Sequence, residues 1–315
     1  MPCLPHILIL CMGAQALGVA ADVAPSIHAL FRSSDRGRTW TRSDAGLQGT
    51  ARINALAASS HRHYAGTDAG VFVSDDSGVT WREGTVIPGP SRRVLDLIVR
   101  DGTLYAGTDG GGLLRSDDNA RTWERVDVGR GSRRVRSLTQ ADGALFAGLD
   151  SGGVLRSSNG GRTWVALDEG LPKGAQVFDL AEMGGAVFAG LYSKGLYRLD
   201  GPEGRWRRTG EVLPLALVAV GDTLVAGHNP GGIFWSSDQG QSWRATTGDL
   251  PTEAPVWAMG GDRELVLAGV SDGIYRSENK GRSWSRAEGG LPPICPGIAF
   301  LVSEPLILAA VIIRE

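Results

Sequence analysis

SSDRGRTW, residues 33–40, is the first copy of a motif, S-x-D-x-G-x-T-W, that recurs through the chain, and the sixth copy reads SSDQGQSW at 236–243. The Trp that ends the motif stands at Trp40, Trp81, Trp123, Trp164, Trp206, Trp243 and Trp284, with gaps of 41, 42, 41, 42, 37 and 41 residues. A fixed period of about 40 residues indicates one supersecondary unit per period. Seven such units fill the chain.

Each unit contains four short segments typical of β-strands, separated by Gly and Asp clusters. In one unit these segments cover 92–99, 103–108, 112–116 and 122–127. Asp101-Gly102 between the first two is a hairpin signal. Four strands in a unit of about 41 residues are typical of a β-propeller blade, and propellers commonly have about 4 to 8 blades.

The two ends of the chain complement each other. The segments HALFRS (28–33) and TWTRSD (39–44) match the third and fourth strands of a unit, whereas GIAFLVS (297–303) and LILAAVI (306–312) match the first two. Such closure leaves no open ring. We therefore predict an all-β protein: a single seven-bladed β-propeller of four-stranded antiparallel blades, closed by pairing of the N- and C-terminal strands in one shared blade.

Composition agrees with this fold and excludes several classes of function. The 315 residues include 46 Gly, and 42% of them are hydrophobic, which excludes disorder. Basic and acidic residues number 32 and 34, so no global field attracts nucleic acid. The three cysteines indicate neither a disulfide framework nor a metal site, and no cofactor motif is present.

The N-terminal segment is typical of a signal peptide. Residues 7–21, ILILCMGAQALGVAA, are uncharged, and Val19 and Ala21 are spaced like the small residues before a cleavage site. We expect residues 1–21 to be a signal peptide and residues 22–315 to form a periplasmic or secreted, monomeric propeller. The C-terminal run LILAAVII has eight residues, whereas a membrane-spanning helix needs about 20, so no membrane span is expected.

The motif copies, with the preceding YAGTDGGGLLRS-type segment, resemble the Asp-box, or bacterial neuraminidase repeat. Propellers of this kind include sialidases, xyloglucan-hydrolysing enzymes, sortilin-type receptors and photosystem assembly factors, so the resemblance is specific for fold and not for function. On the turn between the third and fourth strands, an Asp or Asn oxygen accepts backbone N–H bonds. We predict this structural role for Asp35, Asp76, Asp118, Asn159, Asp238 and Asn279.

A set of basic residues precedes the inner strands of successive blades. These predicted ligand-binding residues are Arg52, Arg92, Arg93, Arg133, Arg134 and Lys173. Guanidinium groups suit carboxylate, sulfate or phosphate, so the set predicts a patch for an acidic protein partner or an anionic glycan. The alternative is that these charges pair with local acidic groups.

An acidic set stands on the same face, at the turn before the third strand: Asp68, Asp109, Asp150 and Asp272. The segment around Asp109 is similar to the one that carries catalytic carboxylates in xyloglucan-hydrolysing relatives, which makes Asp109 and Asp68 the candidate catalytic residues of an alternative interpretation. A glycosidase needs two carboxylates about 5 to 9.5 Å apart. Those relatives form their cleft between two propellers, and this chain has residues for one.

Two further acidic residues, Asp96 and Asp179, lie in otherwise apolar inner strands. They are interpreted as partners of neighbouring arginines or as ligand groups facing the channel. The favoured function is an exported, non-enzymatic binding or assembly propeller that uses its arginine-bearing face. The alternatives are a glycoside hydrolase of sialidase or xyloglucanase type, and a module that stabilises a larger envelope complex.

Overall fold

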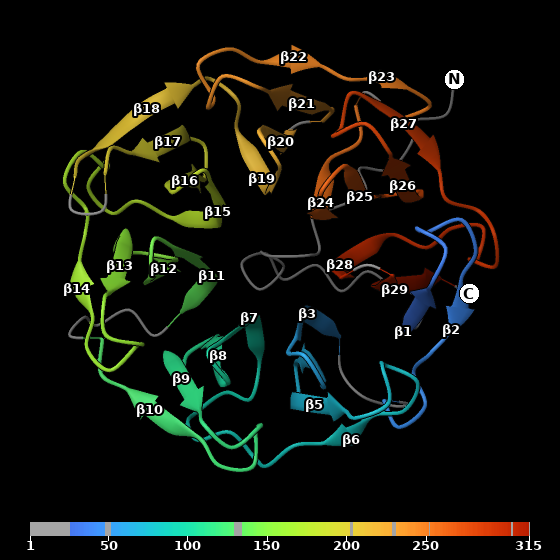
Figure 1. Ribbon diagram of the computed structural model, residues 1–315, viewed down its shortest axis with the longest axis horizontal. Helices are drawn as coiled ribbons and strands as arrows, with labels where there is room; N and C mark the ends of the chain where they lie inside the picture. Colours follow the sequence, from blue (N-terminus) through green and yellow to red (C-terminus); the bar gives the residue numbers. More distant parts are fainter. Residues whose placement is uncertain are drawn as a thin grey trace, which may run out of the picture.

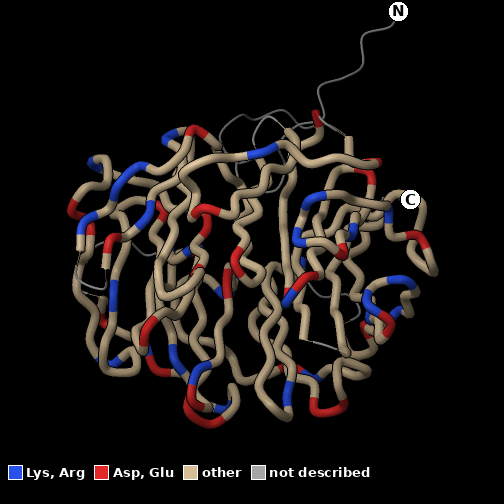
Figure 2. Tube along the Cα trace, turned by 45° about the horizontal axis from the view of Figure 1, so that its top comes forward, with Lys and Arg blue, Asp and Glu red and all other residues tan. Residues whose placement is uncertain are grey.

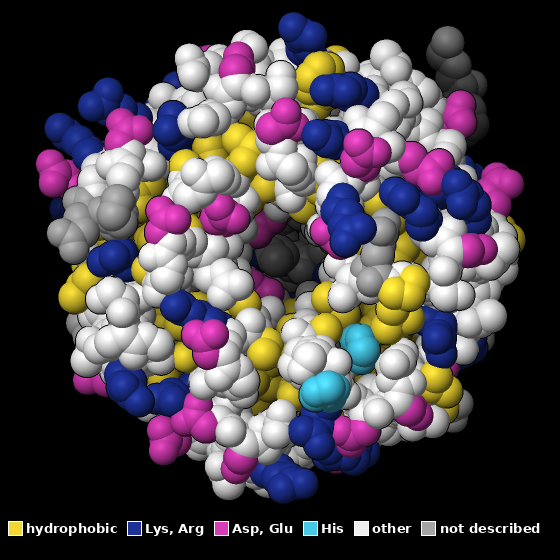
Figure 3. All heavy atoms as spheres, in the orientation of Figure 1, with side chains coloured by type: hydrophobic (Ala, Val, Ile, Leu, Met, Phe, Trp, Pro, Cys, Tyr) yellow, Lys and Arg dark blue, Asp and Glu magenta, His cyan; other side chains and the backbone are white. Residues whose placement is uncertain are grey.

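The computed structural model describes residues 26–47, 52–128, 134–201, 204–228, 231–251, 253–303 and 305–314. The predicted signal peptide, residues 1–21, lies outside these ranges. The described residues form seven sheets around a central axis (Figure 1), which confirms the predicted seven-bladed β-propeller. Within these ranges no helix is long and apolar enough to cross a membrane. Seen along the axis, acidic side chains edge the central opening (Figure 3).

The blades follow one another around the ring in chain order. Blade 1 consists of β3(Ile53–Ala58), β4(His63–Thr67), β5(Gly70–Ser74) and β6(Arg82–Glu83); blade 2 of β7(Val94–Arg100), β8(Thr103–Thr108), β9(Leu113–Ser116) and β10(Glu124–Val126); blade 3 of β11(Val135–Ala141), β12(Ala144–Leu149), β13(Val154–Ser157) and β14(Val165–Ala166); blade 4 of β15(Val177–Met183), β16(Ala186–Leu191), β17(Gly195–Leu199) and β18(Trp206–Gly210); blade 5 of β19(Pro214–Val220), β20(Thr223–His228), β21(Ile233–Ser236) and β22(Arg244–Ala245); blade 6 of β24(Val256–Asp262), β25(Leu265–Val270), β26(Gly273–Ser277) and β27(Ser283–Arg286); and blade 7 of β28(Gly297–Ser303), β29(Leu306–Arg314), β1(Ser26–Ser33) and β2(Thr41–Arg42).

Blade 7 contains both ends of the described chain. β1 pairs antiparallel with β29 along its whole length, from Ser26 opposite Arg314 to Ser33 opposite Ile307. β28 pairs with the other edge of β29. The predicted closure by terminal strands is therefore confirmed, and β29 lies inside a sheet with neighbours on both sides.

The hydrophobic core lies between neighbouring blades. Between blades 7 and 1, for example, Leu30 and Leu308 pack with Phe72 and Trp81, all buried. Burying a large apolar side chain contributes about 1.5–3 kcal/mol. The motif Trp is part of this packing, and its indole N–H donates to the backbone oxygen of the motif Gly, as Trp40 does to Gly37 at 3.1 Å.

The segment after each outer strand extends toward the next blade. In blade 6 it forms a short fifth strand, β23(Thr247–Gly248), parallel to β27. Isolated parallel bridges join Thr39 to Gly289 and Ala45 to Thr80 in the same way. The four-stranded blades are therefore also tied together along the outer rim.

Every inner strand begins with a shift in register. The shift lies between Ile53 and Ala55 in β3, between Val135 and Ser137 in β11, and between Val177 and Asp179 in β15. A bulge leaves one residue unpaired and redirects its side chain. The bulged residues, including Arg136 in blade 3 and Phe178 in blade 4, lie beside the turns that enter the inner strands.

Candidate functional site

The two predicted sets of charged residues lie side by side on one face of the ring. We call this the entry face, because it carries the turns into the inner strands and the turns between second and third strands. The Asp109 N–H donates to the Arg93 carbonyl at 2.9 Å, and the Asp150 N–H donates to the Arg134 carbonyl at 3.2 Å. The backbone thus holds one Arg next to one Asp in each blade.

The arginines reach across the boundary to the aspartate of the preceding blade. Arg93 of blade 2 contacts Asp68 of blade 1, with 3.0 Å between Nε and Oδ1. Arg134 of blade 3 makes two bonds to Asp109 of blade 2, Nε to Oδ1 at 2.7 Å and Nη2 to Oδ2 at 2.6 Å. The two sets that the sequence separates into basic and acidic therefore form one connected arrangement.

The arrangement continues to Arg136, the bulged residue of β11. The Arg136 Nε bonds to Asp150 Oδ1, and Arg134 Nη1 lies 3.5 Å from Asp150 Oδ2. The Arg136 side chain is buried, and its guanidinium lies 4.7 Å from the ring centroid of Phe178. We call these six residues the Arg–Asp row: Asp68, Arg93, Asp109, Arg134, Asp150 and Arg136.

An aromatic pair follows the row in blade 4. Phe178 and Tyr192 stack with ring centroids 5.1 Å apart and planes inclined by 19°. They occupy the positions that Arg136 and Asp150 occupy in blade 3, and the Tyr192 N–H donates to the Gln176 carbonyl just as Asp150 does to Arg134. Tyr192 is 48% exposed. Guanidinium, Phe ring and Tyr ring thus form a stack that ends in an exposed aromatic side chain.

The sequence reasoning missed this pair. Its signal is the segment GLYSKG at 190–195, which stands where the three preceding blades have Asp after the second strand. Comparison of aligned blades, rather than the search for charged residues, would have found it. The exposed Lys194 lies in the same turn.

The ion pairs fix the protonation state of the row. Hydrogen bonding and the charge of Arg134 hold the pKa of Asp109 below its usual value despite partial burial, and the same contact raises the pKa of Arg134. A general acid for glycoside hydrolysis needs a raised pKa. Asp109 therefore lacks the property that this role requires.

The remaining predicted basic residues have different surroundings. Arg92 and Lys173 are exposed on the entry face. Arg52 is partly buried near His28, whose pKa is lowered by burial and by the charge of Arg52. Arg133 lies outside the described residues. Basic and acidic residues are interspersed over the whole ring (Figure 2), rather than gathered in a single-sign patch.

Asp96 and Asp179 bond to the backbone of the next blade, so their interpretation as partners of arginines is wrong. Asp96 accepts the Leu138 N–H at 2.6 Å and the Leu97 N–H at 2.8 Å. Asp179 accepts the Leu217 N–H at 2.8 Å and the Leu180 N–H at 2.9 Å. All four carboxyl oxygens are thus used in bonds that link inner strands.

Burial raises the pKa of both groups. The pKa of Asp96 is about 7, to which the nearby carboxyl of Asp179 also contributes, and that of Asp179 is about 6. Their backbone N–H bonds act in the opposite direction, because they favour the ionised form. These are the strongly raised carboxyl pKa values of the described residues.

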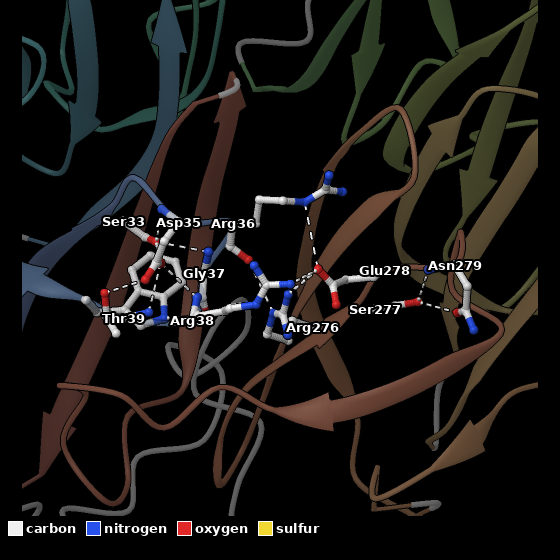
Figure 4. A network of polar contacts seen from close by, with 11 residues as sticks. Ser33, Asp35, Arg36, Gly37, Arg38, Thr39, Arg276, Ser277, Glu278 and Asn279 are labelled. Atoms are coloured by element: carbon white, nitrogen blue, oxygen red, sulfur yellow. Dashed lines mark hydrogen bonds and ion pairs between the residues drawn. The ribbon is translucent and has the colours of Figure 1, made fainter.

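The S-x-D-x-G-x-T-W turns lie on the face opposite the entry face, and Figure 4 shows the first of them. Asp35 Oδ1 accepts the N–H groups of Arg38 and Thr39 at 3.0 and 2.9 Å, and Oδ2 accepts the Thr39 hydroxyl at 2.6 Å. Such bonds hold the pKa of Asp35 below its usual range. The Ser242 hydroxyl and N–H likewise lower the pKa of Asp238 to about 2.

The other motif residues take the same position. Asp76 and Asp118 accept bonds like those of Asp35. Asn159 Oδ1 accepts the Thr163 N–H at 3.0 Å, and its amide donates to the Thr163 hydroxyl at 2.8 Å. Asn279 bonds to Ser283 in the same manner. An amide therefore makes this turn as well as a carboxylate does.

No group of three or more His, Cys, Asp or Glu side chains in the described ranges is arranged to hold a metal ion. No protein-family model matches the sequence, and no curated protein matches it. Several solved structures share its fold, and three of them are compared here.

The extracellular domain of a proposed one-component system from B. thetaiotaomicron is 15% identical, with a TM-score of 0.68 over 85% of this chain and 39% of that one. YCF48 bound to D1 peptide is 16% identical, with a TM-score of 0.66 over 92% and 98% of the two chains. A GH74 xyloglucanase from Xanthomonas campestris is 17% identical, with a TM-score of 0.65 over 88% and 54%. This chain therefore spans well under half of the first relative and about half of the xyloglucanase. At such identities the likeness is to the propeller fold alone.

Proposed function

We propose that this protein is an exported, non-enzymatic binding or assembly propeller of the Asp-box type, and that its entry face holds a protein partner. The observation that carries the proposal is Tyr192, which stacks on Phe178 at the end of the Arg–Asp row and remains 48% exposed. Aromatic and arginine side chains dominate the binding energy of protein interfaces. A large side chain held rigidly by stacking loses little conformational entropy on binding.

The charges of the face define the partner further. The Arg–Asp row contains three arginines and three aspartates that bond to one another, so it presents polar edges rather than a bare positive field. The exposed cations beside it are Arg92, Lys173 and Lys194. A segment with an aromatic or apolar anchor and nearby acidic residues complements Tyr192 and these cations. One propeller of similar fold, YCF48, is recorded with a bound D1 peptide, which is consistent with a peptide as partner.

A glycoside hydrolase is the second candidate. It is favoured by the raised pKa values of Asp96 and Asp179, since a general acid needs such a value. Two observations argue against it: both carboxyls use all their oxygens in backbone bonds, and Asp109 has a lowered pKa. Hydrolysis of a sialoside or β-glucan reporter by the purified protein, abolished in Asp96→Asn, would replace the binding proposal with this one.

The test of the binding proposal compares two variants in the same blade. Tyr192→Ala removes the exposed end of the stack on the entry face, whereas Val165→Ala removes a 59% exposed side chain on the outer strand β14. The protein is used to capture partners from the envelope fraction of its source, and the dissociation constant of the recovered partner is then measured.

We expect Tyr192→Ala to weaken binding at least tenfold, about 1.4 kcal/mol, and Val165→Ala to leave it unchanged. Both variants should melt like the parent protein. Equal losses in the two variants, or none in either, would show that the partner binds elsewhere. Export is tested separately, because the mature protein recovered from the envelope should begin at residue 22.

A further inference from the structure

Three guanidinium groups meet a single carboxylate at the boundary between blades 6 and 7 (Figure 4). The Nη2 atoms of Arg38 and Arg276 each lie 2.8 Å from Glu278 Oε1, and Arg36 Nε lies 3.8 Å from the same oxygen. Arg36 and Arg38 belong to the motif turn of blade 7, whereas Arg276 lies in β26 of blade 6. This cluster is on the face opposite the entry face, so it is separate from the proposed protein site.

Equivalent positions in other blades provide a comparison. The residue before the motif Asp is Asp75 in blade 1, Asp117 in blade 2 and Glu278 in blade 6. Asp75 pairs with Arg62 and Arg82, and Asp117 pairs with Arg115. Those carboxylates use both oxygens in these contacts, whereas the three contacts of Glu278 converge on Oε1.

The cluster carries excess positive charge. Three guanidinium groups face the carboxylate of Glu278, which leaves a charge of about +2. The nearest acidic residue of the motif turn, Asp35, uses its carboxylate within that turn, and counting it still leaves a positive sum. Such an excess favours an anion at this point.

A depression of about 230 Å³ adjoins the cluster, since Arg276 and Glu278 belong to its lining. The other lining residues are Asn279, Ser283, Trp284 and Ser285. Arg276 stands opposite Ser285 across the β26 and β27 pair, so the guanidinium and this hydroxyl lie on the same side of the sheet. Guanidinium, amide and hydroxyl groups together match the acceptor oxygens of an oxyanion.

We propose that this depression binds a tetrahedral oxyanion, sulfate or phosphate, either free or as a substituent of a sugar. Arg276, whose side chain is only 12% exposed, supplies the fixed guanidinium, and Arg38 supplies a mobile one at the rim. Glu278 competes for the same two groups, because it is itself an anion bound by them. The ligand therefore shares these arginines with Glu278 or displaces it.

The test is a calorimetric and NMR titration of the full chain with sodium sulfate and with sodium phosphate, against sodium chloride at equal ionic strength. We expect saturable binding of the oxyanions only. Arg276→Gln should weaken this binding at least tenfold, whereas Glu278→Gln should strengthen it several-fold by removing the competing carboxylate. Arg115→Gln, the equivalent change in blade 2, is the matched control and should leave binding unchanged.

Binding that does not saturate beyond the chloride reference would overturn the proposal, as would equal effects of Arg276→Gln and Arg115→Gln. If Arg276→Gln does not fold, Arg38→Gln at the exposed rim takes its place with the same expected loss. A second arm uses a sulfated and a phosphorylated monosaccharide. Tighter binding than that of the inorganic ions identifies a sugar-borne group, and equal or weaker binding identifies the free ion.

Discussion

Arg134 of blade 3 and Asp109 of blade 2 form a two-point ion pair across the blade boundary, with 2.7 Å between Nε and Oδ1 and 2.6 Å between Nη2 and Oδ2. The pair joins two residues that the sequence assigns to different roles, one to anion binding and the other to catalysis. Each is the other's first partner in the folded chain. A ligand on this face therefore meets paired charges.

The strength of this pair is measured by a double-mutant cycle of Arg134→Ala and Asp109→Ala. Both side chains are partly exposed, at 34% and 24%, so solvent weakens the attraction. We expect a coupling energy of about 0.5–2 kcal/mol from denaturant unfolding, because the geometry is bidentate. Arg92→Ala, one blade away at an exposed position, should change stability by less than about 0.5 kcal/mol. Strictly additive effects would mean that the pair contributes nothing.

Replacement of Asp238 tests the motif turn. Asn should be tolerated better than Ala, since Asn159 and Asn279 make the same backbone bond in their blades. Thermal melting should therefore rank Asp238→Ala below Asp238→Asn, with the latter close to the parent. Because the pKa of Asp238 is lowered to about 2, its stabilising effect is complete above about pH 4 and is lost as the pH falls toward 2. Equal melting of the two variants would contradict a hydrogen-bonding role.

The buried Asp96 should produce the opposite pH dependence. Its folded pKa of about 7 exceeds the ordinary value of 3.8, so the folded state holds a proton that the unfolded state has released. Stability is therefore greatest below about pH 4 and declines as the pH rises to 7, by a few kcal/mol at about 1.4 kcal/mol per pKa unit. Asp96→Asn should flatten this decline in denaturant unfolding. Asp101→Asn, at an 88% exposed side chain, should leave it intact.

Deletion of residues 306–315 should abolish cooperative unfolding of the whole ring. β29 lies between β1 and β28, and its residues Leu308, Ala309, Ala310 and Val311 are fully buried. Their removal exposes two strand edges and the core between blades 7 and 1. Circular dichroism melting of the truncated and full chains is the measurement. A truncated chain that melted at the parent's temperature would refute the contribution of the closing blade.

The period of the motif Trp was sufficient to predict the ring, because each unit must pack against its neighbours. Departures from the motif also have visible consequences. In the third copy Ala120 replaces Gly at a φ of 64°, and the indole N–H of Trp123 in that blade makes no hydrogen bond to the described residues. The other motif Trp residues each find a backbone acceptor, for example Trp284 on Gly281 at 3.0 Å. Local chemistry that repeats was thus readable from the sequence.

The candidate site was only partly predictable. The sequence places Arg93 and Asp68 on one face, but their pairing depends on how far one blade is rotated from the next. Asp96 is predicted to pair with a charge, yet it bonds to the Leu138 N–H of a strand about forty residues away. Tyr192 carries no charge and belongs to no motif, so a search by residue chemistry passes over it.

The pairing of β1 with β29 has a consequence for how the protein is made. Ser26 and Arg314 are neighbours in space, so the ring cannot close until nearly three hundred residues have been synthesised. Contacts at such separation slow folding and leave strand edges open in the meantime. A chain that stays incomplete until residue 314 is available remains threadable through a translocation channel for the whole of its synthesis. Late closure and export in an unfolded state are thus compatible requirements, met by the same strand.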